Sequence, residues 1–222
     1  MNYAIVLAGG KGLRIGLDKP KQFIDINNEP MIVTSIKAFN DVNEIDSICV
    51  VCLKEYISYL NELVKKYSLN KVNLVVEGGA SRQESVFNGL KALKNQGILD
   101  SDIVLIHDGA RPFVSKEIIL NNIKVAKEND AAITVIKSTD SLLMSKTGKV
   151  VDSYLDREHV YNCQTPQSFK FSLIFEAHNQ ARNDGIFDAS DDARLVIRMN
   201  KKVSLVLGDA NNKKITYKED LQ

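Results

Sequence analysis

The chain has 222 residues, of which 44% are hydrophobic and 26% are charged. A chain of this length can bury a sizeable core without disulfides or metal ions to hold it together. Its 29 basic and 28 acidic residues give a formal net charge of +1, which argues against a protein that binds nucleic acid or a membrane surface. The three cysteines fit a reducing compartment, and no apolar stretch reaches the length of a membrane span. We therefore expect a soluble, cytoplasmic protein with a single domain over residues 1–222.

Short runs rich in Val, Ile and Leu alternate with longer segments of helical period. In chain order, the pattern predicts strands at residues 3–7, 47–53, 72–77, 103–107, 131–136 and 203–207, and helices at residues 31–39, 55–67, 81–94 and 115–128. Several of these strands are apolar on both faces, which is typical of a parallel sheet covered by helices. The alternation predicts an α/β fold with a doubly wound, mostly parallel sheet.

The alternation breaks between about residues 137 and 164. Residues 142–145 and 150–155, joined by the sequence KTGK, predict a β-hairpin with a glycine-containing turn. Because this segment is polar, we expect it to project from the body as a β-arm. Helices near residues 170–182 and 190–199 are expected to follow before the last strand.

A glycine-rich loop, LAGGKGLR at residues 7–14, follows the first expected strand. Glycines let backbone N–H groups approach a phosphate closely, and local positive charge comes from Lys11, Arg14, Lys19 and Lys21. The loop lacks the Gly-Lys-Ser/Thr of a P-loop, and its glycine spacing is one residue too long for a dinucleotide fingerprint. A phosphate-binding loop and a plain turn with a solvated basic face both remain open from this loop alone.

Two further loops follow the third and fourth expected strands. Asp108 stands in HDGARP at residues 107–112, where it could hold a divalent cation or simply pair with Arg111. Residues 77–81 bring glycines to the start of a helix whose first residues, SRQE, have the capping-box pattern. Because all three loops follow strands of one parallel sheet, they are expected at the same sheet edge, where such folds bind ligands. Together they predict a nucleotide-handling enzyme.

The cysteines and histidines give weaker signals. Cys49 and Cys52 match C-x-x-C but lie inside an apolar strand, so core packing is favoured over a zinc or redox site. His107 borders the expected site, while His159 and His178 match no acid or nucleophile pattern. No Ser-His-Asp triad is expected.

Six motifs in order make the whole chain resemble the cytidylyltransferases that produce CDP-activated polyol phosphates. They are residues 7–14, PKQF at 20–23, Gly78-Gly79 with Arg82 and Ser85, HDGARP at 107–112, QTPQ at 164–167, and KIT at 214–216 followed by EDL at 219–221. The group includes enzymes that act on 2-C-methyl-D-erythritol 4-phosphate in non-mevalonate isoprenoid biosynthesis and on ribitol 5-phosphate in teichoic-acid synthesis. The resemblance implies a Rossmann-like nucleotidyltransferase fold, transfer of a cytidylyl group from CTP with release of pyrophosphate, and a divalent metal, usually Mg²⁺.

The resemblance also assigns residues to roles. The catalytic side chains fall on Arg14, Lys21, Arg157 and Lys214, and the nucleotide contacts fall on Ala8, Gly9, Gly10, Lys11, Gly12, Gly79 and Ser85. The acceptor contacts fall on Asp108, Arg111, Ser141 and Arg157, with Asp108 also binding the metal. In this family the hairpin arm reaches across a homodimer and completes the partner's acceptor site, so a homodimer is expected.

Two departures from the family pattern bear on these roles. Ser141 stands where the family has Thr, which keeps a hydroxyl group and loses a methyl group. The sequence NKKIT at residues 212–216 leaves open whether Lys213 or Lys214 contacts the phosphate of the nucleotide.

The acceptor is less clearly marked than the donor. Residues 82–86, 108–112 and 190–193 resemble the methylerythritol-phosphate branch, whereas residues 7–10 and 20–23 resemble the ribitol-phosphate branch equally well. We favour 2-C-methyl-D-erythritol 4-phosphate, with ribitol 5-phosphate as the alternative. A non-catalytic nucleotide-binding domain on the same scaffold is a remote alternative, and the glycine spacing disfavours a dinucleotide-dependent oxidoreductase.

Overall fold

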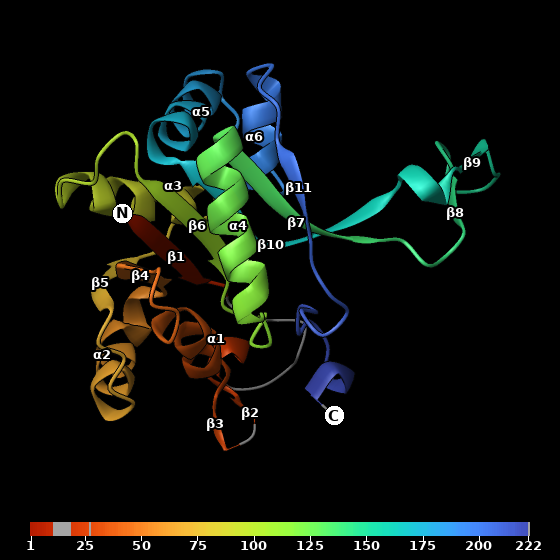
Figure 1. The fold of residues 1–222 in the computed structure, drawn as a ribbon. Helices are drawn as coiled ribbons and strands as arrows, with labels where there is room; N and C mark the ends of the chain where they lie inside the picture. The colour runs from red at the N-terminus through yellow and green to blue at the C-terminus, as the bar shows by residue number, and fades with distance from the viewer. Residues whose placement is uncertain (11–18, 27, 222) are drawn as a thin grey trace.

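The computed structural model describes residues 1–10, 19–26 and 28–221, and its centre is a seven-stranded sheet (Figure 1). In sheet order the strands are β11 (Ser204–Leu207), β7 (Ala131–Lys137), β10 (Tyr161–Lys170), β6 (Ile103–Asp108), β1 (Asn2–Ala8), β4 (Ser47–Cys52) and β5 (Val72–Glu77). Neighbouring strands run parallel except where β10 pairs with β6 and β7. The predicted mostly parallel, doubly wound sheet is confirmed.

Helices cover both faces of this sheet, because its central strands are apolar on both sides. One face packs against α1 (Met31–Asn40), α2 (Ile57–Lys66) and α4 (Lys116–Asn129), and the other packs against α3 (Arg82–Asn95), α5 (Phe171–Asn183) and α6 (Asp192–Arg198). Short 3₁₀ helices lie at Lys21–Phe23, Lys54–Tyr56, Arg157–His159 and Lys218–Leu221. Cys49 and Cys52 are buried within β4, as the sequence predicts for core residues. Within the described ranges, no helix combines the length and apolarity needed to cross a membrane.

The strand β10 was not predicted, although it lies in the middle of the sheet. Its sequence, YNCQTPQSFK, is polar and contains Pro166, features that normally argue against a central strand. Its register against β7 shifts between Cys163 and Gln167, so Pro166 falls in an irregular stretch of the ladder. The polar side chains of this stretch bond to distant parts of the chain: Gln164 to Asn212, Thr165 to the Asp108 N–H, and Gln167 to the Asp192 N–H. The two-residue strands β2 (Asp25–Ile26) and β3 (Glu29–Pro30) were also missed, because they are too short to show a period.

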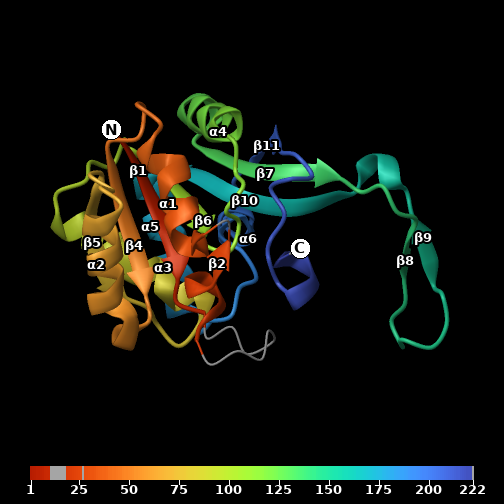
Figure 2. The ribbon, with the colours of Figure 1, turned by 90° about the horizontal axis from the view of Figure 1, so that it is seen from below.

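The chain between β7 and β10 forms the predicted arm. Its hairpin consists of β8 (Leu142–Met144) and β9 (Ser153–Leu155), with Leu142 opposite Leu155. Both views show the arm projecting away from the helices and sheet (Figures 1 and 2). Several large apolar side chains on the arm are exposed in the single chain, among them Leu143, Val150, Val151 and Tyr154.

Candidate active site

A pocket of about 720 Å³ lies at the carboxyl ends of β1 and β6, where the winding of the sheet reverses direction. Ligands bind at this position in open α/β sheets. Eight residues that the sequence assigns to the site line this pocket: Ala8, Gly9, Gly10, Lys21, Gly79, Ser85, Asp108 and Lys214. The three loops that follow β1, β5 and β6 therefore meet at one edge, as predicted.

The first wall of the pocket is the start of the glycine-rich loop, which is held in place by Gln22. The buried Gln22 amide Nε2 donates hydrogen bonds to the carbonyl oxygens of Ala8 (2.6 Å) and Gly10 (2.9 Å). Gln22 is therefore a positioning residue for this loop. This role was not predicted, although the residue stands inside the PKQF motif.

The second wall is formed by the loop after β5 and the start of α3. Ser81 caps α3 by accepting a hydrogen bond from the Glu84 N–H (3.1 Å), which confirms the capping residue that the sequence predicts. The Ser85 hydroxyl accepts from the Gly79 N–H (3.0 Å) and donates to the Ser81 carbonyl (2.9 Å). A Cβ atom on Gly9 would lie 3.3 Å from Ser85 Oγ, so glycine allows these two loops to approach closely.

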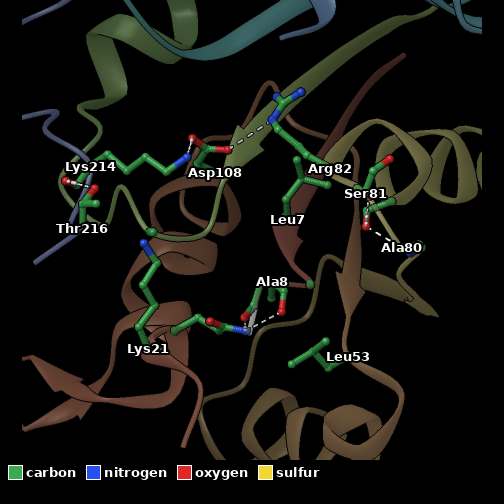
Figure 3. A pocket seen from close by; sticks show the side chains of 16 residues that line it. Leu7, Ala8, Lys21, Leu53, Ala80, Ser81, Arg82, Asp108, Lys214 and Thr216 are labelled. Atoms are coloured by element: carbon green, nitrogen blue, oxygen red, sulfur yellow. Dashed lines mark hydrogen bonds and ion pairs between the residues drawn. The ribbon is translucent and has the colours of Figure 1, made fainter. Parts of the chain in front are cut away.

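Asp108, at the end of β6, is the centre of charge in the pocket (Figure 3). Its carboxylate lies 2.9 Å from Lys214 Nζ, 3.7 Å from Arg82 Nε and 3.8 Å from Arg111 Nε. Burial alone would raise the pKa of Asp108, but these cations, led by Lys214, hold it well below its usual range. These three cations face Asp108 and a second carboxylate, Asp192, which pairs with Arg82, so the cluster keeps an excess of one positive charge to receive an anionic ligand.

Arg82 is held against Asp108 by a second, buried carboxylate. Arg82 Nη2 lies 2.8 Å from Asp192 Oδ2, and the other oxygen of Asp192 accepts a hydrogen bond from His178 Nε2 at 3.0 Å. The Gln167 carbonyl Oε1 also accepts from the Asp192 N–H at 3.0 Å. His178 therefore has an acid partner that its sequence surroundings do not reveal, because Asp192 comes from the next helix.

The third wall is a C-terminal strap, which we define as residues 212–217. Within it, Lys214 points at Asp108 (Figure 3), whereas Lys213 Nζ lies 4.0 Å from Asp220 on the exposed side. Lys21 Nζ donates a hydrogen bond to the Ile215 carbonyl at 2.7 Å. Of the two lysines that the sequence left open, Lys214 is the one that lines the pocket.

His107, next to Asp108, is a buried structural residue. Its Nε2 lies 3.0 Å from the Arg111 carbonyl and its Nδ1 lies 3.0 Å from Thr165 Oγ1. Because a carbonyl can only accept, we assign the proton to Nε2 and let Nδ1 accept from Thr165. Thr165 Oγ1 in turn accepts from the Asp108 N–H at 3.1 Å. This chain of bonds fixes the loop that carries Asp108 and Arg111.

The neutral state of His107 should make folding stability depend on pH. Burial lowers the pKa of His107 from 6.5 to about 4. The unfolded chain therefore binds this proton first, and stability is lost as the pH falls from about 6.5 towards 4. We expect the His107 contribution to fall by about 2 kcal/mol between roughly pH 7.5 and pH 5. Denaturant unfolding of the wild type and of His107→Gln at several pH values over this range measures the contribution. If the free energy of unfolding depends on pH equally in the two proteins, the assignment is wrong.

Comparison with known proteins identifies the family. Residues 2–222 match the family model for 2-C-methyl-D-erythritol 4-phosphate cytidylyltransferase. The chain belongs to this family. It is 43% identical over 221 residues to the 2-C-methyl-D-erythritol 4-phosphate cytidylyltransferase of Clostridium novyi, covering 99% of this chain and 93% of the relative. It is 37% identical to a ribitol-5-phosphate cytidylyltransferase of Streptococcus agalactiae, with 99% and 92% coverage.

Solved structures of the same family share the fold. The crystal structure of 4-diphosphocytidyl-2C-methyl-D-erythritol synthase from Anaerococcus prevotii matches with a TM-score of 0.86 and 34% identity, covering 100% of this chain and 92% of that one. The 2-C-methyl-D-erythritol 4-phosphate cytidylyltransferase from Thermus thermophilus matches with a TM-score of 0.77 and 31% identity, covering 98% and 94%.

Not all of the residues that the family assigns to the site meet at this pocket within one chain. Ser141 and Arg157 are exposed on the arm, outside the residues that line the pocket. Arg111 contacts Asp108 but is not among the residues that line the pocket, and its Nη1 donates to the Asn212 carbonyl at 2.7 Å. The predicted contacts Lys11, Gly12 and Arg14 lie outside the described residues.

The donor set in the pocket bears on which metal could bind there. Among the described residues, no group of three or more His, Cys, Asp or Glu side chains could ligate a metal ion. Asp108 is the one acidic residue among the described residues that line the pocket. Mg²⁺ is usually held by one or two carboxylates together with substrate phosphates and water, so a single carboxylate fits Mg²⁺ bound jointly with a nucleotide.

Proposed function

We propose that this chain is a CTP-dependent cytidylyltransferase that transfers a cytidylyl group to a small polyol phosphate and releases pyrophosphate. The observation that carries the proposal is the convergence of the glycine-rich loop, Lys21, Lys214 and Asp108 on one pocket at the switch point of the sheet. Membership of the 2-C-methyl-D-erythritol 4-phosphate cytidylyltransferase family supports it. A non-catalytic nucleotide-binding domain would have no need for this combination of cations and carboxylate.

The reaction needs positioning and charge neutralisation more than proton transfer. An oxygen of the acceptor phosphate attacks the α-phosphorus of CTP and forms a new P–O bond, while the bond from the α-phosphorus to the bridging oxygen breaks and pyrophosphate leaves. Because the attacking oxygen is already an anion, no strong general base is required. Fixed cations that face the developing negative charge then supply most of the catalysis.

Each wall of the pocket has a proposed part in this reaction. The backbone at Ala8–Gly10, with Lys11, Gly12, Gly79 and Ser85, would frame the nucleotide. Lys21 and Lys214, together with Arg14, would neutralise charge on the triphosphate. Asp108 would hold Mg²⁺, which supplies further neutralisation of phosphate charge when it is bound.

The acceptor site is proposed to lie between two subunits. Asp108 would contribute from the pocket and Arg111 from beside it, and Ser141 and Arg157 would reach the acceptor from the arm of a partner chain. The exposed apolar side chains of the arm support this homodimer, because such a surface is usually covered in an assembly. A cytoplasmic location is part of the proposal, since the three free cysteines suit a reducing compartment.

The acceptor that we favour is 2-C-methyl-D-erythritol 4-phosphate, giving 4-diphosphocytidyl-2-C-methyl-D-erythritol for isoprenoid biosynthesis. Ribitol 5-phosphate, giving CDP-ribitol for teichoic acid or capsule, is the second candidate, because relatives of both names match nearly the whole chain.

Pyrophosphate release with CTP and Mg²⁺ tests the function and the acceptor together. We expect a preference for 2-C-methyl-D-erythritol 4-phosphate over ribitol 5-phosphate of about tenfold or more in kcat/KM, which corresponds to about 1.4 kcal/mol of transition-state discrimination. The opposite preference would assign the chain to the ribitol branch. No release with either acceptor, from folded protein that still binds CTP, would favour the binding-domain alternative.

A further inference from the structure

Ile215 follows Lys214 in the strap, and its backbone carbonyl is the acceptor of the Lys21 hydrogen bond. Its side chain is fully buried and packs in a small cluster with Met31 at the start of α1 and Ala110 after β6. This cluster is separate from the two large cores on the faces of the sheet. A buried apolar anchor of this kind fixes the strap against the body at one point.

The backbone of Ile215 connects the strap to two loops of the pocket. Its N–H donates to the Ala110 carbonyl at 2.8 Å, which ties the strap to the loop that follows Asp108. Its carbonyl accepts the hydrogen bond from Lys21 Nζ at 2.7 Å. The preceding residue is Lys214, whose Nζ lies 2.9 Å from Asp108. The positions of both lysines therefore depend on where Ile215 sits (Figure 3 shows the two lysines and Asp108).

The other end of the strap is fixed by Asn212. Its buried side chain donates from Nδ2 to Gln164 Oε1 (3.0 Å) and to the Thr165 carbonyl (2.9 Å), both on β10. Asn212 and Ile215 thus fix the two ends of a short span that contains Lys213 and Lys214. A hydrogen-bonded anchor at one end and an apolar anchor at the other leave Lys214 little freedom of position.

We propose that Ile215 is a positioning residue for the transfer reaction, which sets the placement of both Lys21 and Lys214 without touching substrate. The inference rests on the proposed roles of these lysines. Its physical basis is that a shift of about 1 Å in a charged group can cost about 10²-fold in rate. Removing the side-chain anchor frees the strap to move, and with it the acceptor of the Lys21 bond and the backbone that carries Lys214.

The test compares Ile215→Ala with Ile174→Ala, a matched loss of a fully buried isoleucine on α5 that does not line the pocket. We expect similar drops in Tm, but a fall in kcat at saturating CTP of about tenfold or more for Ile215→Ala alone. Ile215→Val should keep the anchor and most of the turnover. If either alanine variant does not fold, Ile215→Thr and Ile174→Thr, which shorten the buried side chain less and also remove apolar contact, carry the same comparison.

A double-mutant cycle shows whether Ile215 acts through the lysines. In a Lys21→Ala/Lys214→Ala background, the added effect of Ile215→Ala should shrink to less than about threefold, because both groups that it positions are already gone. A kcat for Ile215→Ala within twofold of Ile174→Ala, or a full tenfold effect in the background that lacks both lysines, would overturn the proposal. Near-normal turnover in Lys214→Ala alone would instead overturn the role proposed for Lys214, and the inference with it.

Discussion

Replacement of Lys21 by alanine is expected to lower turnover at least about 100-fold while the protein stays folded. Lys21 Nζ lies in the pocket and is oriented by the Ile215 carbonyl at 2.7 Å. Loss of one charge-assisted contact to the transition state should raise the barrier by about 2.7–4 kcal/mol, by analogy with the loss of an oxyanion-hole donor. Steady-state pyrophosphate release with CTP and Mg²⁺ measures this effect.

The chain contains a matched control for this substitution. Lys71 also donates from Nζ to a backbone carbonyl, that of Val42 at 2.6 Å, but it lies outside the pocket. Lys71→Ala should therefore remove a similar bond and leave kcat within about twofold of wild type. Near-normal turnover in well-folded Lys21→Ala would remove Lys21 from the catalytic residues.

Mixing two inactive variants is expected to restore activity if the arm of one subunit serves the pocket of the other. Lys21→Ala damages a pocket, and Arg157→Ala damages an arm. In a mixed dimer, the pocket that keeps Lys21 faces the arm that keeps Arg157, so one of its two sites is intact. Random exchange makes half of the dimers mixed, and the mixture should recover about a quarter of wild-type turnover.

The control for this experiment uses two variants damaged in the same pocket. A mixture of Lys21→Ala and Lys214→Ala leaves each pocket of a mixed dimer without one lysine, so no recovery is expected. Subunit exchange is verified by co-purification of differently tagged chains. If mixed dimers form with Arg157→Ala and turnover still does not recover, the arm does not complete the partner's site.

The sequence predicts six of the seven strands of the central sheet. The strand that it does not predict, β10, depends on distant hydrogen-bond partners that a local sequence pattern does not reveal. In β10, Gln164, Thr165 and Gln167 are buried, but each bonds to a partner far away in the chain. The periodicity of a sequence depends only on which side chains are apolar. A buried strand whose polar groups are satisfied by distant loops therefore looks like a loop.

The same limit explains which parts of the site were predicted. The glycine-rich loop and Asp108 are visible because short motifs at strand ends share one sheet edge. The pairing of Arg82 with Asp192 joins residues 110 positions apart, and nothing near either residue marks it. The choice between Lys213 and Lys214 depends on the direction in which the strap runs past Asp108, which only the folded chain determines.

The bond between Lys21 and the Ile215 carbonyl joins two residues 194 positions apart in the chain. Each of the other walls of the pocket also follows a strand that pairs in parallel with a distant strand, which makes the contact order of this region high. We expect contacts of this kind to form late, because the entropy of closing long loops must be lost before they can form. During refolding, helical content should therefore return before enzymatic activity does. The time at which turnover recovers would then report when the strap docks against the body, as one of the last steps of folding.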